Sequence, residues 1–553
     1  MIHKNNIYRN LIRLAAVPSV SGTEQEARAA YLLRDMLCDI PYFQRQPGNV
    51  RLIPLENDPL GRSIVTAFWE NPSPCPDTVI LTGHYDVVDV EEYGHLKDIA
   101  YDAEAVTARI SEMPLDEDSR KDWESGEWIF GRGTADMKYG HALCLELLRH
   151  FSQEPDALHG NLLYVAVCGE ETNSEGMLRA VPFFNELAEK KGLRYRALLL
   201  TECFMTEDQA NDPNRYIHYG ASGKAMPMFL CVGEATHGGE PFLGLDPTLL
   251  NAELYRQLSL CPDFCQQSLG ETTPPPVCLK SKDLKACYSV STALYAVSYY
   301  NIISVDLHPG ELMDRLKGIC QAAFESALAL RSQRIAGYQN STGQKPAVRQ
   351  YEPCVKTFYE VYQAVRGQYQ GDYPAHLRAF ARELAEQKME LQDICIELVR
   401  HTYEQYSDKR PMIILSVIPP YYPDVAPDWG RPEAARLLHC LEDVIAYAGE
   451  AYGETLRFKN YYMGLSDLSY TGLREGLDFE ALFQNLAGAG LVYDFPFEEL
   501  KRFSVPSIVL GGYGKDFHRH TERLNRHYNF DVLPQLYERL IRGLLGVADG
   551  SGQ

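Results

Sequence analysis

The chain has 553 residues, of which 45% are hydrophobic and 23% are charged, ordinary values for a globular protein. It carries 53 lysines and arginines against 75 aspartates and glutamates, so its net charge is −22. Such an acidic chain is not expected to bind nucleic acid or an anionic membrane surface over a broad face. The sequence contains neither a long apolar stretch nor a secretory signal, so we expect a cytoplasmic protein with no membrane partner.

Strand and helix patterns alternate through the first 220 residues. Ser21 to Glu24 is typical of a capping box at the start of a helix over 24–37. Short apolar runs predict buried parallel strands, and amphipathic stretches predict the helices between them. The strand runs are 78–82, 161–168 and 196–201, with a helix over 137–152. This order indicates an α/β fold with a mixed, largely parallel sheet flanked by helices.

The pattern changes after residue 220. Two-residue alternation over 224–234 and 282–308, with helical stretches beside it, predicts a small α+β unit. A charged helical segment over 356–406 and an apolar strand at 411–418 then return to the first kind of pattern. We therefore expect a split domain, 1–219 and 351–553, interrupted by an inserted α+β domain, 220–350.

Side chains that bind metals follow the predicted strands. They are His84 after 78–82, Glu170 and Glu171 after 161–168, Glu202 after 196–201, and His518 after a strand at 505–511. Asp136 lies in a glycine-rich turn that opens the helix over 137–152. Ligands bind at the carboxyl ends of the strands in open α/β sheets. Each residue by itself is better explained as an ordinary turn residue, but the whole set in this order predicts a metal site.

The motifs HxD, GRGxxDMK, EE, a lone acid and a late histidine occur in this order. This order resembles the co-catalytic zinc aminoacylases, desuccinylases and exopeptidases of peptidase family M20, clan MH. The opening string LIRLAAVPSVSGTEQEA also resembles that family. The strings GLSDLSY and GGYGKDFHRHTERL resemble more closely a family member that acts in arginine utilisation. The resemblance implies that the split domain is catalytic and that 220–350 is a lid domain of the dimerisation type.

The resemblance also implies two divalent metal ions, zinc or else manganese or cobalt. The implied ligands are His84 and Glu202 for one ion, Glu171 and His518 for the other, and Asp136 between the two. Asp86 would fix the tautomer of His84 through a hydrogen bond. Glu170 would be the general base, and His237 of the lid would reach the substrate across the interface of a homodimer.

The implied reaction is hydrolysis of an amide bond in an N-acyl amino acid or peptide-like substrate, in arginine or ornithine catabolism. A metal-bound hydroxide would attack the carbonyl while Glu170 moves the proton. Two alternatives stay open. One is an exopeptidase that acts on short peptides, and the other is a non-catalytic binding protein that keeps the fold.

Some features depart from the family pattern. The segments 92–128 and 356–410 are predicted insertions, and we expect the first to cover the site or its rim. His518 and His520 both fit the last ligand, and Glu522, four residues after His518, favours His518. Asp467 is expected to support the site, and Lys515 is a weaker candidate for contact with a substrate carboxylate.

Overall fold

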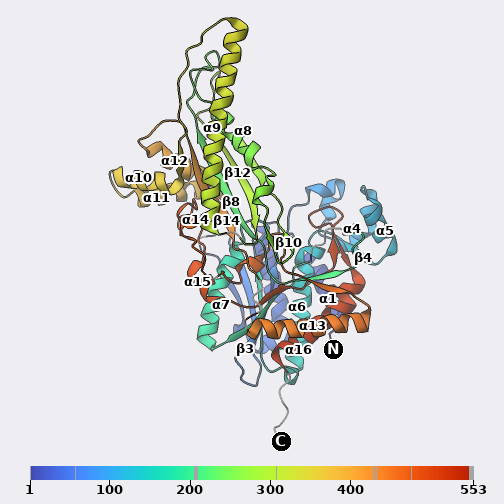
Figure 1. Ribbon diagram of the computed structural model, residues 1–553. Coiled ribbons are helices and arrows are strands. Elements are labelled where there is room, and N and C mark those ends of the chain that lie inside the picture. The colour runs from blue at the N-terminus through green and yellow to red at the C-terminus, as the bar shows by residue number, and fades with distance from the viewer. Residues whose placement is uncertain are drawn as a thin grey trace. The chain divides into compact units, whose positions relative to one another are not determined.

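The chain forms two compact units in a computed structural model that describes residues 2–56, 58–204, 210–306, 308–426, 430, 432–474 and 476–546. The first unit spans Met1–Ala221, Val425–Leu473 and Pro496–Gln553. The second unit spans Ser222–Asp424 and Arg474–Phe495. Figure 1 shows the elements of each unit by label.

An eight-stranded sheet forms the centre of the first unit. Its strands lie in the order β1 (Val50–Pro54), β2 (Ser63–Trp69), β5 (Asn161–Val167), β3 (Asp77–His84), β6 (Arg194–Leu200), β16 (Ser507–Val509), β7 (Arg215–His218) and β15 (Leu456–Lys459). The central strands β5, β3, β6 and β16 are parallel, whereas the pairs β1–β2, β2–β5 and β16–β7 are antiparallel. The prediction of a mixed, largely parallel sheet is confirmed.

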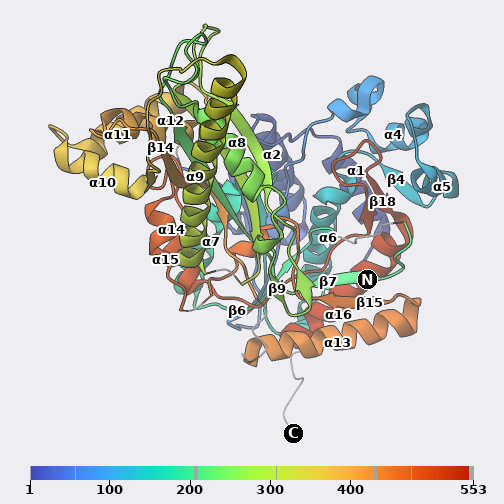
Figure 2. The same ribbon diagram turned by 45° about the horizontal axis from the view of Figure 1, so that its top comes forward.

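Helices cover both faces of this sheet (Figures 1 and 2). Leu162, Tyr164 and Ala166 of β5 share a core with the helices of one face. Those helices are α1 (Lys4–Ala15), α2 (Gln25–Cys38), α6 (Tyr139–Gln153), α13 (Pro432–Tyr452) and α16 (Leu533–Leu545). Side chains alternate along a strand, so the intervening residues of β5 point to the opposite face, where α7 (Glu175–Lys191) contacts β2 and β5. Burial on both faces explains why these strands are continuously apolar.

The start of α2 differs from the predicted capping box. The helix begins at Gln25 without a side-chain cap. The hydroxyl of Ser21 instead donates to the carboxylate of Asp86 at 2.5 Å, and Glu26 accepts from the backbone amide of Gly22. Ser21 therefore serves a residue 65 positions away, a tertiary partner that local spacing does not reveal.

The predicted insertion after β3 forms two helices and leads into a second, small sheet. Helices α4 (Ala103–Arg109) and α5 (Glu117–Ser125) enclose a separate apolar cluster that includes Val106, Ile110 and Trp128. Strand β4 (Trp128–Phe130) pairs with β18 (Arg523–Asn525), and β18 pairs with β17 (Gly514–Lys515). The insertion is thereby joined to the segment that carries His518.

A five-stranded sheet forms the centre of the second unit. Its order is β11 (Val277–Asp283), β12 (Tyr295–Ser304), β8 (Gly223–Val232), β14 (Met412–Tyr422) and β13 (Val355–Thr357). Helices α8 (Pro247–Leu258) and α9 (Pro309–Thr342) contact this sheet, and α9 is the long helix in Figure 1. Helices α10 (Phe358–Gln368), α11 (Tyr373–Glu386) and α12 (Leu391–Gln405) share a core with β8 and β14.

The second unit is larger than the inserted domain expected at 220–350. The apolar strand at 411–418 was expected in the first sheet, but as β14 it pairs antiparallel with β8. The segment 356–410 packs on the same sheet through α10, α11 and α12. A strand that is apolar on both faces suits either sheet, so only its pairing partner decides where it belongs.

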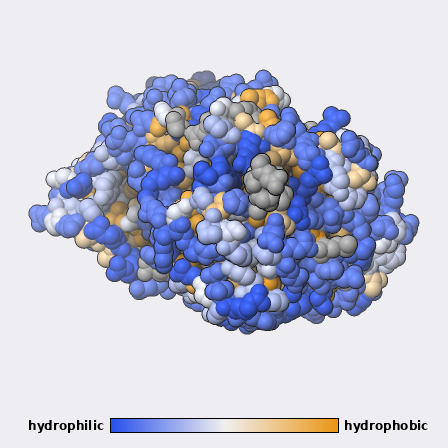
Figure 3. Space-filling view, turned by 90° about the horizontal axis from the view of Figure 1, so that it is seen from below, coloured by the Kyte–Doolittle hydropathy of each residue, from blue (hydrophilic) through white to orange (hydrophobic). Residues whose placement is uncertain are grey.

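The surface face in Figure 3 is mainly hydrophilic, with apolar residues scattered across it, as is normal for a globular chain. No helix in the described part of the chain combines the length and apolar character needed to cross a membrane.

Candidate metal centre

Three neighbouring parallel strands carry the first four candidate side chains. His84 ends β3, Glu170 and Glu171 follow β5, and Glu202 follows β6. Strand β3 lies between β5 and β6, so all three carboxyl ends meet at one edge of the sheet. Gly511 lets the chain after β16 approach Glu202, because a Cβ there would lie 1.5 Å from the Glu202 carbonyl oxygen.

The other two candidates come from the small sheet. Asp136 lies in the turn after β4, and His518 lies in the loop between β17 and β18. Since β4 pairs with β18, the two segments are held side by side although almost 400 residues separate them.

Asp136 stands between two groups of side chains. Its Oδ1 lies 3.2 Å from His84 Nε2, which lies 3.2 Å from Glu202 Oε2. Its Oδ2 lies 3.1 Å from His518 Nε2, which lies 3.1 Å from Glu171 Oε1. Both groups have the ligand atoms and spacing that could hold a metal ion. The structure thus brings together the five residues proposed as ligands.

Asp86 contacts His84 differently from the expectation. Nδ1 of His84 lies 3.0 Å from the backbone carbonyl of Asp86 and 3.6 Å from its carboxylate. The carboxylate accepts hydrogen bonds from the Ser21 hydroxyl and from the backbone amides of Glu170 and Glu171. Burial raises the pKa of Asp86, but His84 and these donors outweigh that effect and hold it below the ordinary value. Asp86 therefore orients both His84 and the Glu170–Glu171 turn.

Glu170 is largely buried beside the first group. Its Oε2 lies 3.9 Å from His84 Nε2, farther than the carboxylates of Asp136 and Glu202. Burial raises the pKa of Glu170 well above the ordinary value, and the charge of Glu171 adds to this rise. A carboxyl group with a raised pKa, close to the candidate ligands, has the properties of a general base.

Arg132 and Glu522 form a buried pair whose role the sequence alone does not reveal. Arg132 donates to Glu522 Oε2 at 2.6 Å and to the backbone carbonyl of His518 at 3.0 Å. Glu522 Oε1 accepts from the backbone amides of Ala135 and Asp136. One ion pair thus orients both Asp136 and His518. The spacing of Glu522 marked His518 as a ligand, but only the contact with Arg132 reveals what Glu522 does.

Replacing Arg132 by methionine should destabilise the metal-free protein by about 3–5 kcal/mol, because Glu522 would remain buried without its partner. Both side chains are only 1% exposed. Urea unfolding followed by circular dichroism measures the change. The control is Arg109→Met, which removes an exposed pair with Glu112 and should leave the free energy of unfolding almost unchanged. Equal effects of the two substitutions would contradict the assignment.

The remaining candidates lie apart from the two groups or beside them. His520 Nε2 lies 2.9 Å from the carbonyl of Pro114. Among the described residues, His520 is in none of the groups that could hold a metal ion, which are the two above and a third made of His84, Glu170 and Glu171. His237 is exposed in the second unit, and its Nδ1 accepts from the amide of Gly239.

Asp467 is buried, which raises its pKa to about 7, although the charge of His84 partly offsets this. Lys515, the weaker candidate for contact with a substrate carboxylate, is buried and ion-paired with Asp118 and Asp122.

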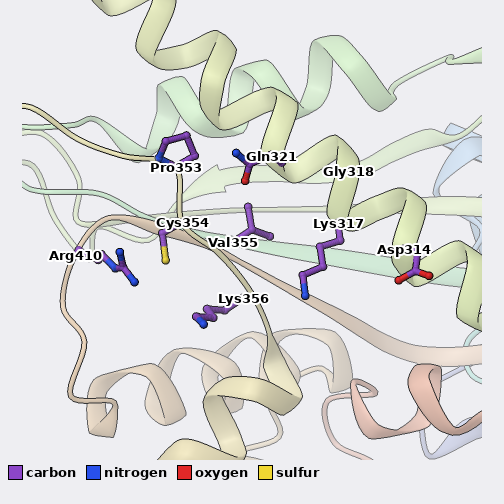
Figure 4. Close-up of a pocket in the computed structure, with 9 residues that line it drawn as sticks. All are labelled: Asp314, Lys317, Gly318, Gln321, Pro353, Cys354, Val355, Lys356 and Arg410. Atoms are coloured by element: carbon purple, nitrogen blue, oxygen red, sulfur yellow. The ribbon is translucent and has the colours of Figure 1, made fainter.

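A separate hollow of about 510 Å³ lies in the second unit, between α9 and the segment around β13 (Figure 4). Its lining includes the basic side chains of Lys317, Lys356 and Arg410 and the acidic side chain of Asp314. Lys317 lies 3.5 Å from Glu360 and Arg410 lies 2.9 Å from Asp408, so these two charges already have acidic partners at the surface. The hollow holds none of the candidate ligands.

The chain is similar to known proteins over its whole length. The sequence pattern of Peptidase family M20/M25/M40 matches residues 80–394. The uncharacterized protein YqjN of Bacillus subtilis (strain 168) is 34% identical over 553 residues, covering 100% of this chain and 98% of YqjN. Protein RocB of the same organism is 31% identical over 536 residues, covering 96% of this chain and 94% of RocB. RocB is the family member to which the strings GLSDLSY and GGYGKDFHRHTERL were likened, so the predicted likeness is confirmed.

A solved structure supports the same fold. The di-peptidase Dug1p from Saccharomyces cerevisiae has a TM-score of 0.54 with 13% identity, covering 99% of this chain and 97% of that chain. At this identity the similarity concerns the fold alone.

Proposed function

Because the chain belongs to Peptidase family M20/M25/M40 and is a metal-dependent hydrolase, we propose that it cleaves an amide bond in an N-acyl amino acid or a short peptide. The observation that carries the proposal is the position of Asp136, one oxygen toward each histidine. A carboxylate shared in this way is what two neighbouring ions need.

The donor set fits two divalent ions, for which we propose zinc. Imidazole nitrogen and carboxylate oxygen are ordinary zinc ligands, whereas calcium and magnesium prefer oxygen alone. His84 and Glu202 would hold one ion, Glu171 and His518 the other, and Asp136 both. Bound ions would lower the pKa of a water molecule and polarise the substrate carbonyl.

Glu170 then moves the proton. Its carboxylate accepts a proton from the attacking water at Oε2 and returns it to the leaving nitrogen. Asp86 holds the backbone amides of Glu170 and Glu171 and so keeps the base and a ligand in fixed relation.

We propose that the second unit is a lid domain. In the resembled family, the lid pairs two subunits and its histidine contributes to the site of the partner. We assign that role to His237, which is exposed and therefore accessible to a partner chain.

Metal content tests the proposal directly. Protein purified without added metal should contain about two ions per chain, and Glu202→Ala and His518→Ala should each lose about one. Mass spectrometry of the native protein and elemental analysis measure the ratio. A parent protein that binds no zinc, manganese or cobalt would overturn the two-ion site.

The substrate class needs a separate assay. N-acyl amino acids, including acyl derivatives of arginine and ornithine, are compared with unblocked dipeptides by following release of the free amine. Faster cleavage of the acyl compounds is the expected result. Preference for dipeptides would replace the proposal by an exopeptidase with the same ligands.

A further inference from the structure

A buried cluster of charges joins the inserted helix α5 to the strands on either side of His518. Lys515 Nζ of β17 lies 3.0 Å from the Asp118 carboxylate and 2.9 Å from that of Asp122. Arg523 of β18 lies 2.7 Å from Asp122 and 2.5 Å from Asp118. Figure 2 shows α5 beside β4 and β18. Two acids of one helix therefore hold one cation from each strand.

The two cations of this cluster are almost completely buried. Lys515 is 4% exposed and Arg523 is 0% exposed. A buried cation is costly unless an acid pairs with it. Besides the two acids of α5, Asp516 pairs with Arg523 at 2.5 Å. Without the two acids of α5, Lys515 and Arg523 would lose four ion-pair contacts of 3.0 Å or less.

Helix α5 is itself held firmly in place. Its N-cap Asp116 accepts from the Ser119 amide at 2.7 Å. The indole of Trp123 donates to the Thr107 carbonyl at 2.9 Å, and Trp123 packs on the apolar cluster of the insertion. The acids of α5 therefore stand on a rigid element.

The loop that carries His518 needs such support. Asp516 and His518 both have positive φ angles, 55° and 66°, a left-handed conformation that residues with a Cβ disfavour. The side chain of His518 is 51% exposed, so core packing does not hold it. Within the loop, Arg523 and Thr521 both donate to Asp516. Arg523 is thus a second anchor of the loop beside Arg132, and its other nitrogens are held by Asp118 and Asp122.

We propose that Asp118 and Asp122 are positioning residues for the metal site at His518. They fix Lys515 and Arg523, these fix the ends of the 516–522 loop, and the loop presents the His518 imidazole to Glu171 and Asp136. This inference rests on the proposed two-ion site, and it assigns a function to the inserted segment that the proposed function does not use.

The test compares metal affinity between variants of the full-length protein. In the double variant Asp118→Asn/Asp122→Asn, the affinity for the ion held by Glu171 and His518 should fall about tenfold or more. The loss of contacts that support a metal ligand typically weakens metal binding by about 10- to 100-fold. Affinity for the ion at His84 and Glu202 should stay within about twofold. Competitive zinc titration with a chromophoric chelator resolves the two steps.

The matched control is Glu124→Gln. Glu124 is an exposed acid of the same helix, so this variant removes a charge without touching β17 or β18 and should bind both ions as the parent does. The single variant Asp118→Asn keeps Asp122, so its metal affinity should lie between that of the double variant and that of the parent. Asp118 is a quarter exposed, so this single variant also keeps the test open if the double variant does not fold.

Two results would overturn the inference. In one, the variants bind both ions as tightly as the parent and hydrogen exchange across residues 516–522 is unchanged. In the other, both affinities fall equally, which would show a general loss of structure. A parent protein that binds no metal would instead contradict the two-ion site itself, so the two failures are distinguishable.

Discussion

Replacing Glu170 by glutamine is expected to lower kcat roughly 10²- to 10⁴-fold, the usual contribution of a general acid–base group. Glutamine keeps the shape of the side chain but cannot accept a proton. The metal content should remain at the parent value, because Glu170 lies farther from His84 Nε2 than the proposed ligands do. Single-turnover amide hydrolysis and elemental analysis on the same samples give both numbers.

The control for this experiment is Glu186→Gln. Glu186 is an exposed residue of α7, the helix that follows the Glu170–Glu171 turn, and its replacement should leave kcat unchanged. A Glu170→Gln protein with full activity would exclude Glu170 as the base. Loss of metal together with activity would move Glu170 from the role of base to that of ligand.

Replacing Asp136 by alanine is expected to remove both metal ions. Each carboxylate oxygen of Asp136 faces a different histidine, and alanine removes both oxygens at once. Bound metal should fall from about two ions to fewer than about one per chain. Activity should fall roughly 10³-fold or more, since metal contributes several kcal/mol to such reactions.

The comparison that gives this result its meaning is Glu202→Gln. Glu202 belongs to one ligand group, so its loss should remove about one ion and leave the group of Glu171 and His518 occupied. If Asp136→Ala also lost only one ion, Asp136 would serve one site and the shared-carboxylate arrangement would be wrong. Far-ultraviolet circular dichroism of both variants shows whether the fold is retained.

Local hydrophobic patterns in the sequence predicted the central strands of the first sheet. Apolar runs that end in His84, Glu170–Glu171 and Glu202 identified parallel strands, and parallel strands bring their carboxyl ends to one edge. Residue type and order were then enough to predict a metal site at this edge. The assignment of individual ligands, Asp136 and His518 among them, came from the family resemblance.

Contacts between distant segments could not be predicted in the same way. The apolar strand at 411–418 suits any buried sheet, and its pairing with β8 places it in the second unit. The spacing of Ser21 and Glu24 fits a capping box, yet a tertiary acceptor, Asp86, takes the hydroxyl. In both cases the local pattern admits two outcomes, and the partner decides between them.

The sequence by itself therefore determined the fold class, the family resemblance and the candidate ligands, because these follow from periodicity, motif order and side-chain chemistry. Only the tertiary structure decided the extent of the second unit, the pair of Arg132 with Glu522, and the attachment of α5 to Lys515 and Arg523. Each of these joins charges or strands tens to hundreds of residues apart. A buried charge must find an opposite charge somewhere, but its sequence neighbourhood does not show where.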